Sequence, residues 1–372
     1  MRTLSPEERS TLHDAVQRLL TDHSSEAHVR QAMATPTGFD PVLWQKLGEM
    51  GITGLLIDEQ FGGAGAGPVE LELVMEAAGA ALLCAPLLGS AVLAATLLQA
   101  LPASDTATRL LPGIASGNCI AAVAITGATG TWTQSGVAVH AAQASGQWSL
   151  TGTASYVLHA QNAHELLVVA RTAAGMGVFA VPAAANGMTV APLPAFDHTL
   201  RLARIDFAAT PAQLTGDGVN AWPAVEQALN MARVALAGEQ AGGARKMLEI
   251  TVEYAKQRVQ FGRAIGSFQA IKHMAADLLL ESEGATSAAR HAAQALADVD
   301  AAGGADAAVT LAAFACADAF STVTATAVQM HGGIAFTWEH PAHLYLRRAR
   351  ADAQLFGTSA FYRERYVQLL GG

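Results

Sequence analysis

The chain has 372 residues, and its 22 Lys and Arg against 31 Asp and Glu give a formal net charge of −9 at pH 7. Hydrophobic residues make up 51% and charged residues only 14%, which excludes a disordered chain, and the acidic balance argues against a general nucleic-acid binder. This length predicts about two or three domains, and the low charge predicts a large core with large subunit interfaces.

The N-terminal third is predicted to be helical. Ser5 followed three residues later by Glu8 is the pattern of a capping box at a helix start. Asp40 before Pro41 is typical of a second helix start, because proline is favoured at the first helical position. The glycine-rich stretch 61–68 is a loop by composition. Two further helices, rich in Ala and Leu, are expected at 69–79 and 89–100.

From about Cys119 the pattern changes to short apolar or alternating segments that are separated by small and polar residues. Such segments favour strands. The expected strands are 119–125, 137–140, 148–151, 165–169, 177–181, 188–191 and 204–207. Together they predict a small all-β unit that ends near Leu214.

The chain is predicted to be helical again from about Val225. These helices are rich in Ala and apolar on more than one face, which favours a helix bundle buried in an oligomer. The expected helices are 229–261, 267–297, 307–329 and a last one that begins near Thr358. We therefore expect three domains, at 1–118 (helical), 119–222 (β) and 223–372 (helical bundle).

The three cysteines, Cys84, Cys119 and Cys316, are widely spaced, and no cluster of His and Cys has the spacing of a metal site. A disulfide framework and a metal centre are not expected, and a reducing cytoplasm suits such a chain. The N-terminus carries acids and no apolar core, so it is not a signal peptide. Gly and Pro interrupt the long apolar stretches, so no membrane span is expected.

Two stretches of the last domain carry distinctive residues. They are 254–277, which contains Arg258, Phe261-Gly262 and Gln269, and 329–341, which contains Gln329 and Gly332-Gly333 and is followed by Arg347-Arg348. In this order of domains they resemble the acyl-CoA dehydrogenase family over essentially the whole chain. The resemblance implies an α+β fold with an N-terminal all-α domain, a middle β-barrel domain and a C-terminal four-helix bundle. It also implies FAD-dependent α,β-desaturation of an acyl-CoA thioester, in fatty acid or sterol degradation.

The same resemblance implies where FAD binds. The cofactor would lie between the β domain and the bundle, with its pyrophosphate and adenine reaching the neighbouring subunit. Arg258 can give charge-assisted hydrogen bonds to the pyrophosphate, Phe261 can pack against the cofactor, and Gly332-Gly333 lets a backbone approach it closely. The other residues implied at FAD are Gln269, Gln329, Thr358, Thr126, Tyr156 and Leu158.

Two features of the β domain depart from the family pattern. Thr126 is retained in the turn that would cover the flavin, but Gly127-Ala128 replaces the acidic residue and proline that follow it in the family. Tyr156 stands at the family's aromatic position, and Leu158 stands where a hydroxyl side chain would contact the flavin. Leu158 can contact the flavin only through its backbone.

The catalytic base is missing from its usual places. The reaction needs a carboxylate that removes the α-proton while the flavin accepts a hydride from the β-carbon. The family places this Glu at one of two positions, which here hold Phe356 and Ala232. Neither side chain can take a proton. Arg233, directly after the second position, is expected to contact the substrate.

Two acids near these positions are candidates for the base. Glu239 follows Ala232 by seven residues, which places it on the same helix face but about 10 Å further along the axis. It could instead pair with a cation such as Arg245. Asp352 precedes Phe356 by four residues and is a comparable candidate.

Three functions stay open. Phe356-Gly357-Thr358 and 336–341 resemble the heterotetrameric (α₂β₂) acyl-CoA dehydrogenases of sterol side-chain and other bulky acyl-CoA degradation, in which a partner completes the site of a base-lacking subunit. The chain could instead be a homodimeric or homotetrameric flavoenzyme with another base or reaction, or a non-enzymatic interaction subunit without flavin. For an enzyme, the resemblance implies an acyl-CoA substrate and an electron-transferring flavoprotein as oxidant.

Overall fold

The computed structural model describes residues 4–216, 220–298 and 304–371. The chain forms two compact units, which are called unit 1 and unit 2 below. Unit 1 contains Ala32–Gly67 and Cys84–Ala232, and unit 2 contains Leu4–Gln31, Pro68–Leu83 and Arg233–Gly372.

Unit 1 combines helices with a strand-rich region. Asp40 caps the first full helix, because its carboxylate accepts a hydrogen bond from the main-chain N of Val42 at 2.9 Å. The helical elements are α3 (Pro41–Glu49), η1 (Glu59–Phe61), η2 (Leu87–Ala94), α5 (Ala95–Ala100), α6 (Asp105–Ala115), η3 (Gln134–Gly136) and η4 (Ala160–Asn162). The strands are β1 (Ala121–Ala124), β2 (His140–Ala144), β3 (Gln147–Leu158), β4 (Glu165–Thr172), β5 (Gly175–Pro182), β6 (Met188–Pro192) and β7 (Leu202–Thr215).

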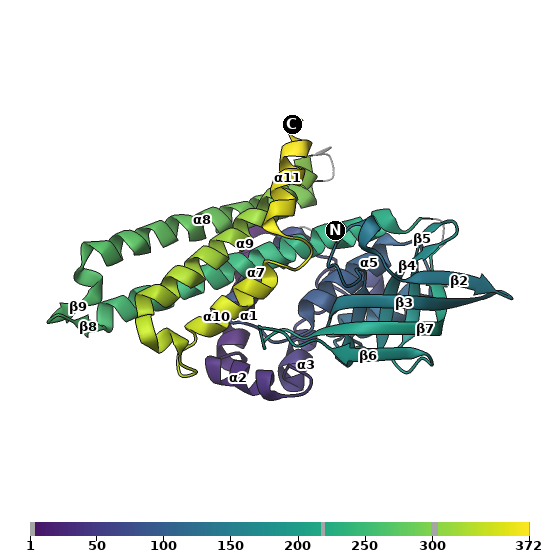
Figure 1. The fold of residues 1–372 in the computed structure, drawn as a ribbon, viewed down its shortest axis with the longest axis horizontal. Coiled ribbons are helices and arrows are strands. Elements are labelled where there is room, and N and C mark those ends of the chain that lie inside the picture. Colours follow the sequence, from purple (N-terminus) through teal and green to yellow (C-terminus); the bar gives the residue numbers. More distant parts are fainter. Residues whose placement is uncertain (1–3, 217–219, 299–303, 372) are drawn as a thin grey trace. The chain divides into compact units, whose positions relative to one another are not determined.

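The strands of unit 1 close into a barrel, as expected. Antiparallel pairs run from β2 to β3, β7, β5 and β4, and the parallel pair His140–Arg171 joins β4 back to β2 (Figure 1). β1 extends the sheet beside β4, and β6 pairs with β7. Apolar side chains that alternate along the strands fill the interior, among them Leu150, Phe179 and Ile205, which are completely buried.

The helix expected at 89–100 has an unusual first half. Residues Leu87–Ala94 form a π-helix, η2, in which every residue is buried, and α5 continues it. η2 packs against β1, and the hydroxyl of Ser90 accepts a hydrogen bond from the main-chain N of Ala121 at 3.1 Å. This bond satisfies a buried backbone donor at the start of the barrel.

Unit 2 is helical. Ser5 and Glu8 form the expected capping box at the start of the first helix. The elements are α1 (Pro6–His23), α4 (Pro68–Ala80), β8 (Val259–Gln260), β9 (Arg263–Ala264), η5 (Ile265–Ser267), α8 (Gln269–Ala297), α9 (Gly304–His331), η6 (Gly332–Phe336), α10 (Ala342–Asp352) and α11 (Ser359–Leu369). Two helices begin in one unit and end in the other, α2 (Glu26–Ala34) and α7 (Trp222–Gln257).

The bundle of unit 2 is built from α7, α8, α9 and α11, and α8 runs along α9 (Figure 1). Its core consists mostly of small residues, including Ala241, Ala289 and Ala312, each almost completely buried. α4 approaches α7 even more closely: a Cβ on Gly242 would overlap the main-chain carbonyl of Glu76. Small side chains thus allow helix backbones to lie unusually near one another.

The structure corrects one helix boundary and adds three helices. α7 ends at Gln257, so the expected helix to Phe261 is wrong, because 259–264 forms the β8–β9 hairpin instead. α2, α6 and α10 have no counterpart among the expected helices. Within the described residues, Gly304–Phe336 is long and apolar enough to cross a bilayer by length and composition, but 56% of its most apolar window is buried in the chain. A core helix passes the same test.

Candidate functional site

Two of the three predicted FAD residues of unit 1, Thr126 and Tyr156, lie around one loop. The hydroxyl of Thr126 donates to the carbonyl of Thr131 at 2.8 Å, which closes the loop on itself. The main-chain N of Ser155 in β3 donates to the carbonyl of Thr126 at 2.8 Å, and the hydroxyl of Tyr156 donates to the carbonyl of Ala128 at 3.2 Å. Two of the three predicted residues are therefore tied to the same loop.

Tyr156 sits at an irregularity of β3, two residues before Leu158. The register with β7 shifts between Ala154 and Val157, and Tyr156 has φ +59°, in the left-handed region. Backbone strain and bulges of this kind gather at functional sites. Leu158 is 4% exposed and lies against η2, where a Cβ on Gly89 would be 3.0 Å from its own Cβ. Its side chain is thus committed to packing.

The β8–β9 hairpin carries the next predicted group. Its loop consists of Phe261 and Gly262, with φ +54° and +79°, as in a type I′ turn. Phe261 is 93% exposed. Arg258 precedes the hairpin and is also exposed, and its guanidinium makes no side-chain hydrogen bond or ion pair to any described residue. A phenylalanine held open on a strained turn beside an unused cation is unusual for a surface that faces only water.

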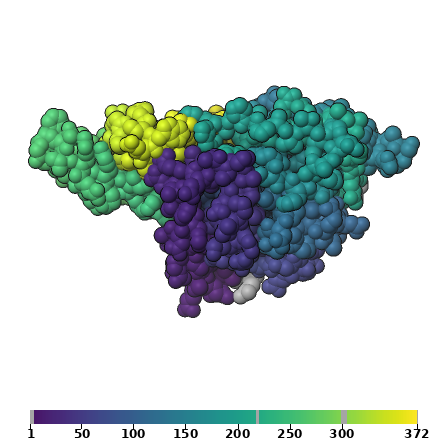
Figure 2. All heavy atoms as spheres, turned by 90° about the horizontal axis from the view of Figure 1, so that it is seen from below, coloured from purple at the N-terminus to yellow at the C-terminus, as the bar shows by residue number. Residues whose placement is uncertain are grey.

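The segment after α9 is similarly open. Gln329, Gly332 and Gly333 are exposed, and a Cβ added to either glycine would meet nothing within 4 Å. Phe336 is 78% and Trp338 55% exposed. The hairpin end of α8 (green) and the segment after α9 (yellow-green) both reach the surface in Figure 2. These residues form an accessible surface of glycines and aromatic rings.

The position of the missing base lies elsewhere in unit 2. Phe356 is completely buried with φ +60°, and its carbonyl accepts a hydrogen bond from the hydroxyl of Tyr362. Arg233, 4% exposed, donates from its Nε to the same hydroxyl at 2.8 Å. The cavity beside them holds about 10 Å³, enough for roughly one water molecule. Thr358 caps α11 there through its hydroxyl, which accepts from the main-chain N of Phe361.

The two acids considered as bases share a buried ion-pair network. Arg348 donates from its Nε to Glu239 at 2.6 Å and lies 3.3 Å from Asp352. All three side chains are less than 9% exposed. Glu239 therefore pairs with Arg348 rather than with Arg245, because Arg245 is engaged by Glu76.

The predicted residues of unit 2 fall into two groups along α7. Arg233 marks one end, with Phe356 and Thr358 nearby through Tyr362. Gln257 marks the other end, next to Arg258 and the hairpin. At 1.5 Å per residue these ends are about 36 Å apart, which is more than the length of one FAD molecule. The two groups therefore do not form one compact site within this chain.

The hairpin group is chemically suited to a dinucleotide. The guanidinium of Arg258 provides charge and several donors, as pyrophosphate requires. The open space above Gly332 and Gly333 leaves backbone groups accessible to a phosphate or ribose, and Phe261 offers an apolar face. The residues present thus fit the adenine and pyrophosphate part of FAD.

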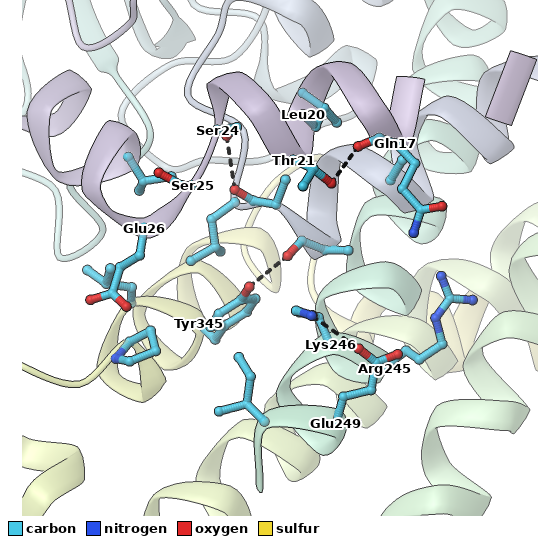
Figure 3. Close-up of a pocket in the computed structure, with 18 of the residues that line it drawn as sticks. Gln17, Leu20, Thr21, Ser24, Ser25, Glu26, Arg245, Lys246, Glu249 and Tyr345 are labelled. Atoms are coloured by element: carbon cyan, nitrogen blue, oxygen red, sulfur yellow. Dashed lines mark hydrogen bonds and ion pairs between the residues drawn. The ribbon is translucent and has the colours of Figure 1, made fainter. Parts of the chain in front are cut away.

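Another cavity of unit 2 contains none of the predicted residues. It holds about 390 Å³ between α1, α2, the end of α4, α7 and α10 (Figure 3). Its hydroxyls bond to backbone carbonyls, Tyr345 to Ala80 at 2.7 Å and Ser24 to Ala81 at 3.1 Å. Its charged side chains are paired within the chain, among them Lys246 with Glu249 at 3.2 Å. Such a lining offers no uncompensated charge to a phosphate group.

One aromatic cluster beside the hairpin group was not predicted from the sequence. The ring of Tyr254, one turn before Arg258, stacks on His331, which directly precedes Gly332. The ring of His340 packs in turn against the ring of His331. Both histidines belong to the distinctive stretch, but nothing in their spacing indicates that they meet Tyr254.

Family models match both ends of the chain. Residues 220–369 match the acyl-CoA dehydrogenase C-terminal domain, and residues 6–118 match the acyl-CoA dehydrogenase N-terminal domain. Among curated proteins, acyl-CoA dehydrogenase IpdE2 of Mycobacterium tuberculosis is 34% identical over 351 residues, which is 94% of this chain and 93% of that protein.

Solved structures match over the full length. The ChsE4-ChsE5 complex from Mycobacterium tuberculosis contains a chain with a TM-score of 0.90 and 29% identity, covering 100% of this chain and 99% of that one. A variant of the Tcur3481-Tcur3483 steroid ACAD has a TM-score of 0.87 and 28% identity, covering 98% of each chain. The similarity includes the barrel as well as the helical parts.

Proposed function

The chain belongs to the acyl-CoA dehydrogenase family, and from this premise we propose that it is the base-lacking, FAD-binding subunit of a heteromeric enzyme. The family activity is the FAD-dependent α,β-desaturation of an acyl-CoA thioester, an oxidation at a CH–CH bond. Phe356 carries the proposal: it is completely buried where the family resemblance places the base. Ala232, at the second position, is completely buried as well.

The chain's own residues have a binding role in this proposal. FAD, when bound, supplies the acceptor for the hydride that leaves the β-carbon. Arg258 neutralises the pyrophosphate, the backbone at Gly332-Gly333 accommodates it, and Phe261 covers an apolar part of the cofactor. A related subunit provides the carboxylate that removes the α-proton. The α₂β₂ assembly is favoured over a homo-oligomer because the structural relatives include the ChsE4-ChsE5 complex.

The proposed substrate is a bulky acyl-CoA, such as a steroid-derived thioester, and the proposed oxidant is an electron-transferring flavoprotein. The similarity to a steroid ACAD supports the substrate class. We place the enzyme in the cytoplasm, which suits three cysteines that form no disulfide in the described part of the chain.

Native mass analysis with a flavin spectrum tests this function. The chain is produced alone and together with a related subunit encoded beside it. The expected product of co-production is a two-plus-two assembly with about one FAD per pair of chains, and only this assembly reduces its flavin when a steroid acyl-CoA is added. A yellow homo-oligomer of this chain that desaturates acyl-CoA by itself would contradict the proposal. A protein that stays colourless with every partner would support the interaction subunit instead.

A further inference from the structure

Three aromatic side chains of unit 2, here called the aromatic stack, join the ends of α7 and α9. The rings of Tyr254 and His331 stack with centroids 4.4 Å apart at 27°. His340, in the segment between η6 and α10, packs on His331 at 4.4 Å and meets Tyr254 edge-on at 6.2 Å. Contacts of this geometry are favourable beyond the area that they bury.

Hydrogen bonds fix the stack to the backbone. The hydroxyl of Tyr254 donates to the main-chain carbonyl of His331 at 3.3 Å, directly before Gly332. The Nδ1 of His331 lies 2.8 Å from the carbonyl of Ala327, and because a carbonyl only accepts, this nitrogen carries the proton. The main-chain N of Ala342 donates to the Nδ1 of His340 at 3.2 Å. The acceptor role of Nδ1 thus makes the ring of His340 a neutral imidazole, whereas the ring of His331 is held by its Nδ1 proton.

The stack lies between the two segments proposed to bind pyrophosphate. Arg258 follows Tyr254 by one helical turn, and its main-chain N donates to the carbonyl of Tyr254 at 2.8 Å. The space beside Gly332 and Gly333 is open, since a Cβ on either would meet nothing within 4 Å. The residue that precedes them, His331, is 4% exposed and anchors one end of the turn.

We propose that the aromatic stack holds the Gly332-Gly333 turn in the position, relative to Arg258, that FAD binding requires. This inference rests on the proposed function and makes Tyr254, His331 and His340 positioning residues. They act through the backbone of the turn and through the end of α7.

The stack is sensitive to protonation. Burial lowers the pKa of His331, and burial together with the neighbouring His331 lowers the pKa of His340. The other titratable or charged groups that face the histidines are Glu26 and Arg30 of α2, Tyr254 of α7, and His343 and Arg347 of α10. The pKa values of both histidines in the folded chain lie below the ordinary value near 6.5. The stack therefore contributes its full free energy of stabilisation above that pH and loses it as the pH falls further.

Two variants of His340 separate the packing of the ring from its protonation. His340→Ala removes the ring, and His340→Phe keeps an aromatic ring that cannot be protonated. His291→Ala is the control, because His291 is an exposed histidine of α8. FAD affinity is measured at pH 8 and pH 5.5 on the flavin-bearing assembly, and hydrogen exchange of residues 328–341 is measured without flavin.

We expect His340→Ala to weaken FAD binding at pH 8 by roughly three- to tenfold and to speed hydrogen exchange at Gly332 and Gly333. His340→Phe should keep the affinity at pH 8 and lose less of it at pH 5.5 than the unchanged protein does. The inference is overturned if His340→Ala matches the His291→Ala control in both measurements, or if His340→Phe retains the full pH dependence. An assembly that binds no FAD would sink the proposed function, whereas the exchange comparison would still decide on the stack.

Discussion

At the scale of single residues, the most informative side chain is Arg258. Its charge is unused by the described part of the chain, although the helix end that carries it is fixed by the backbone bond to Tyr254. Arg258 lies near a strained, exposed phenylalanine, Phe261, and near an open pair of glycines. An arginine that contacts only water would not require these neighbours. The combination favours a bound anion with an apolar part.

Arg258→Ala is expected to weaken FAD binding by roughly ten- to a hundredfold, since a hydrogen bond to a charged group contributes about 1.5–3 kcal/mol. Flavin content after dialysis and titration with FAD measure the effect. Lys256→Ala is the matched control, because Lys256 is two residues away and already pairs with Glu253 at 2.6 Å. Unchanged flavin content in Arg258→Ala would remove Arg258 from the site.

At the scale of elements, the close approach of α4 and α7 depends on glycine. A Cβ on Gly242 would overlap the carbonyl of Glu76, a backbone atom that cannot rotate away. Gly242→Ala is therefore expected to lower the free energy of unfolding by at least about 1–3 kcal/mol. On α8, Gly284 is exposed and a Cβ there would meet nothing within 4 Å, so Gly284→Ala should stabilise by roughly 0.5–1 kcal/mol. Urea unfolding measures the free energy of unfolding of both variants. Equal changes in the two would show that α4 and α7 leave room for a Cβ between them.

Elements whose ends are set by local chemistry were predictable from the sequence. The caps at Ser5 and Asp40 need only side chains within three residues, and both form. The alternating strands and the Ala-rich bundle helices also follow from periodicity over a few turns. The family resemblance then correctly gave the fold class, which periodicity alone does not specify.

Features set by distant contacts were not predictable. The apolar residues near Phe261 continue the pattern of α7, and nothing in a phenylalanine indicates the positive φ of a hairpin turn. α10 is rich in arginine and lacks an apolar stripe, because part of its buried face is the ion pair of Arg348 with Glu239. These two residues are 109 positions apart in the sequence, so their pairing is a property of the fold alone.

At the scale of the whole molecule, charged residues are few, and several of them are nevertheless buried. Glu70, Glu72 and Glu76 of α4 are each 1% exposed. Glu70 pairs with Arg9, and Glu76 pairs with Arg245 and Arg290. Burial, and then the neighbouring Glu76, raises the pKa of Glu72 to about 7.

This buried acid makes the stability of the molecule depend on pH. The folded chain binds the Glu72 proton more tightly than the unfolded chain, so stability falls as the pH rises from about 4.5 to about 7. Glu72→Gln removes this dependence on pH. The free energy of unfolding of the variant should exceed that of the unchanged protein by almost nothing at pH 4.5 and by about 3 kcal/mol at pH 8. Denaturant unfolding at both pH values measures it. If the two proteins differ in free energy of unfolding by the same amount at both pH values, ionisation of Glu72 does not destabilise the folded chain.

The exposed aromatic residues of the hairpin and the adjoining segment have a consequence for how the cell produces this protein. Phe261, Phe336 and Trp338 are features that chaperones and proteases recognise on unassembled chains. In the proposed heteromeric enzyme, copies made in excess over the subunit that covers them would be removed or would aggregate. The amount of active enzyme would then follow the synthesis rate of the scarcer subunit, and balanced translation of the two chains would matter as much as their affinity.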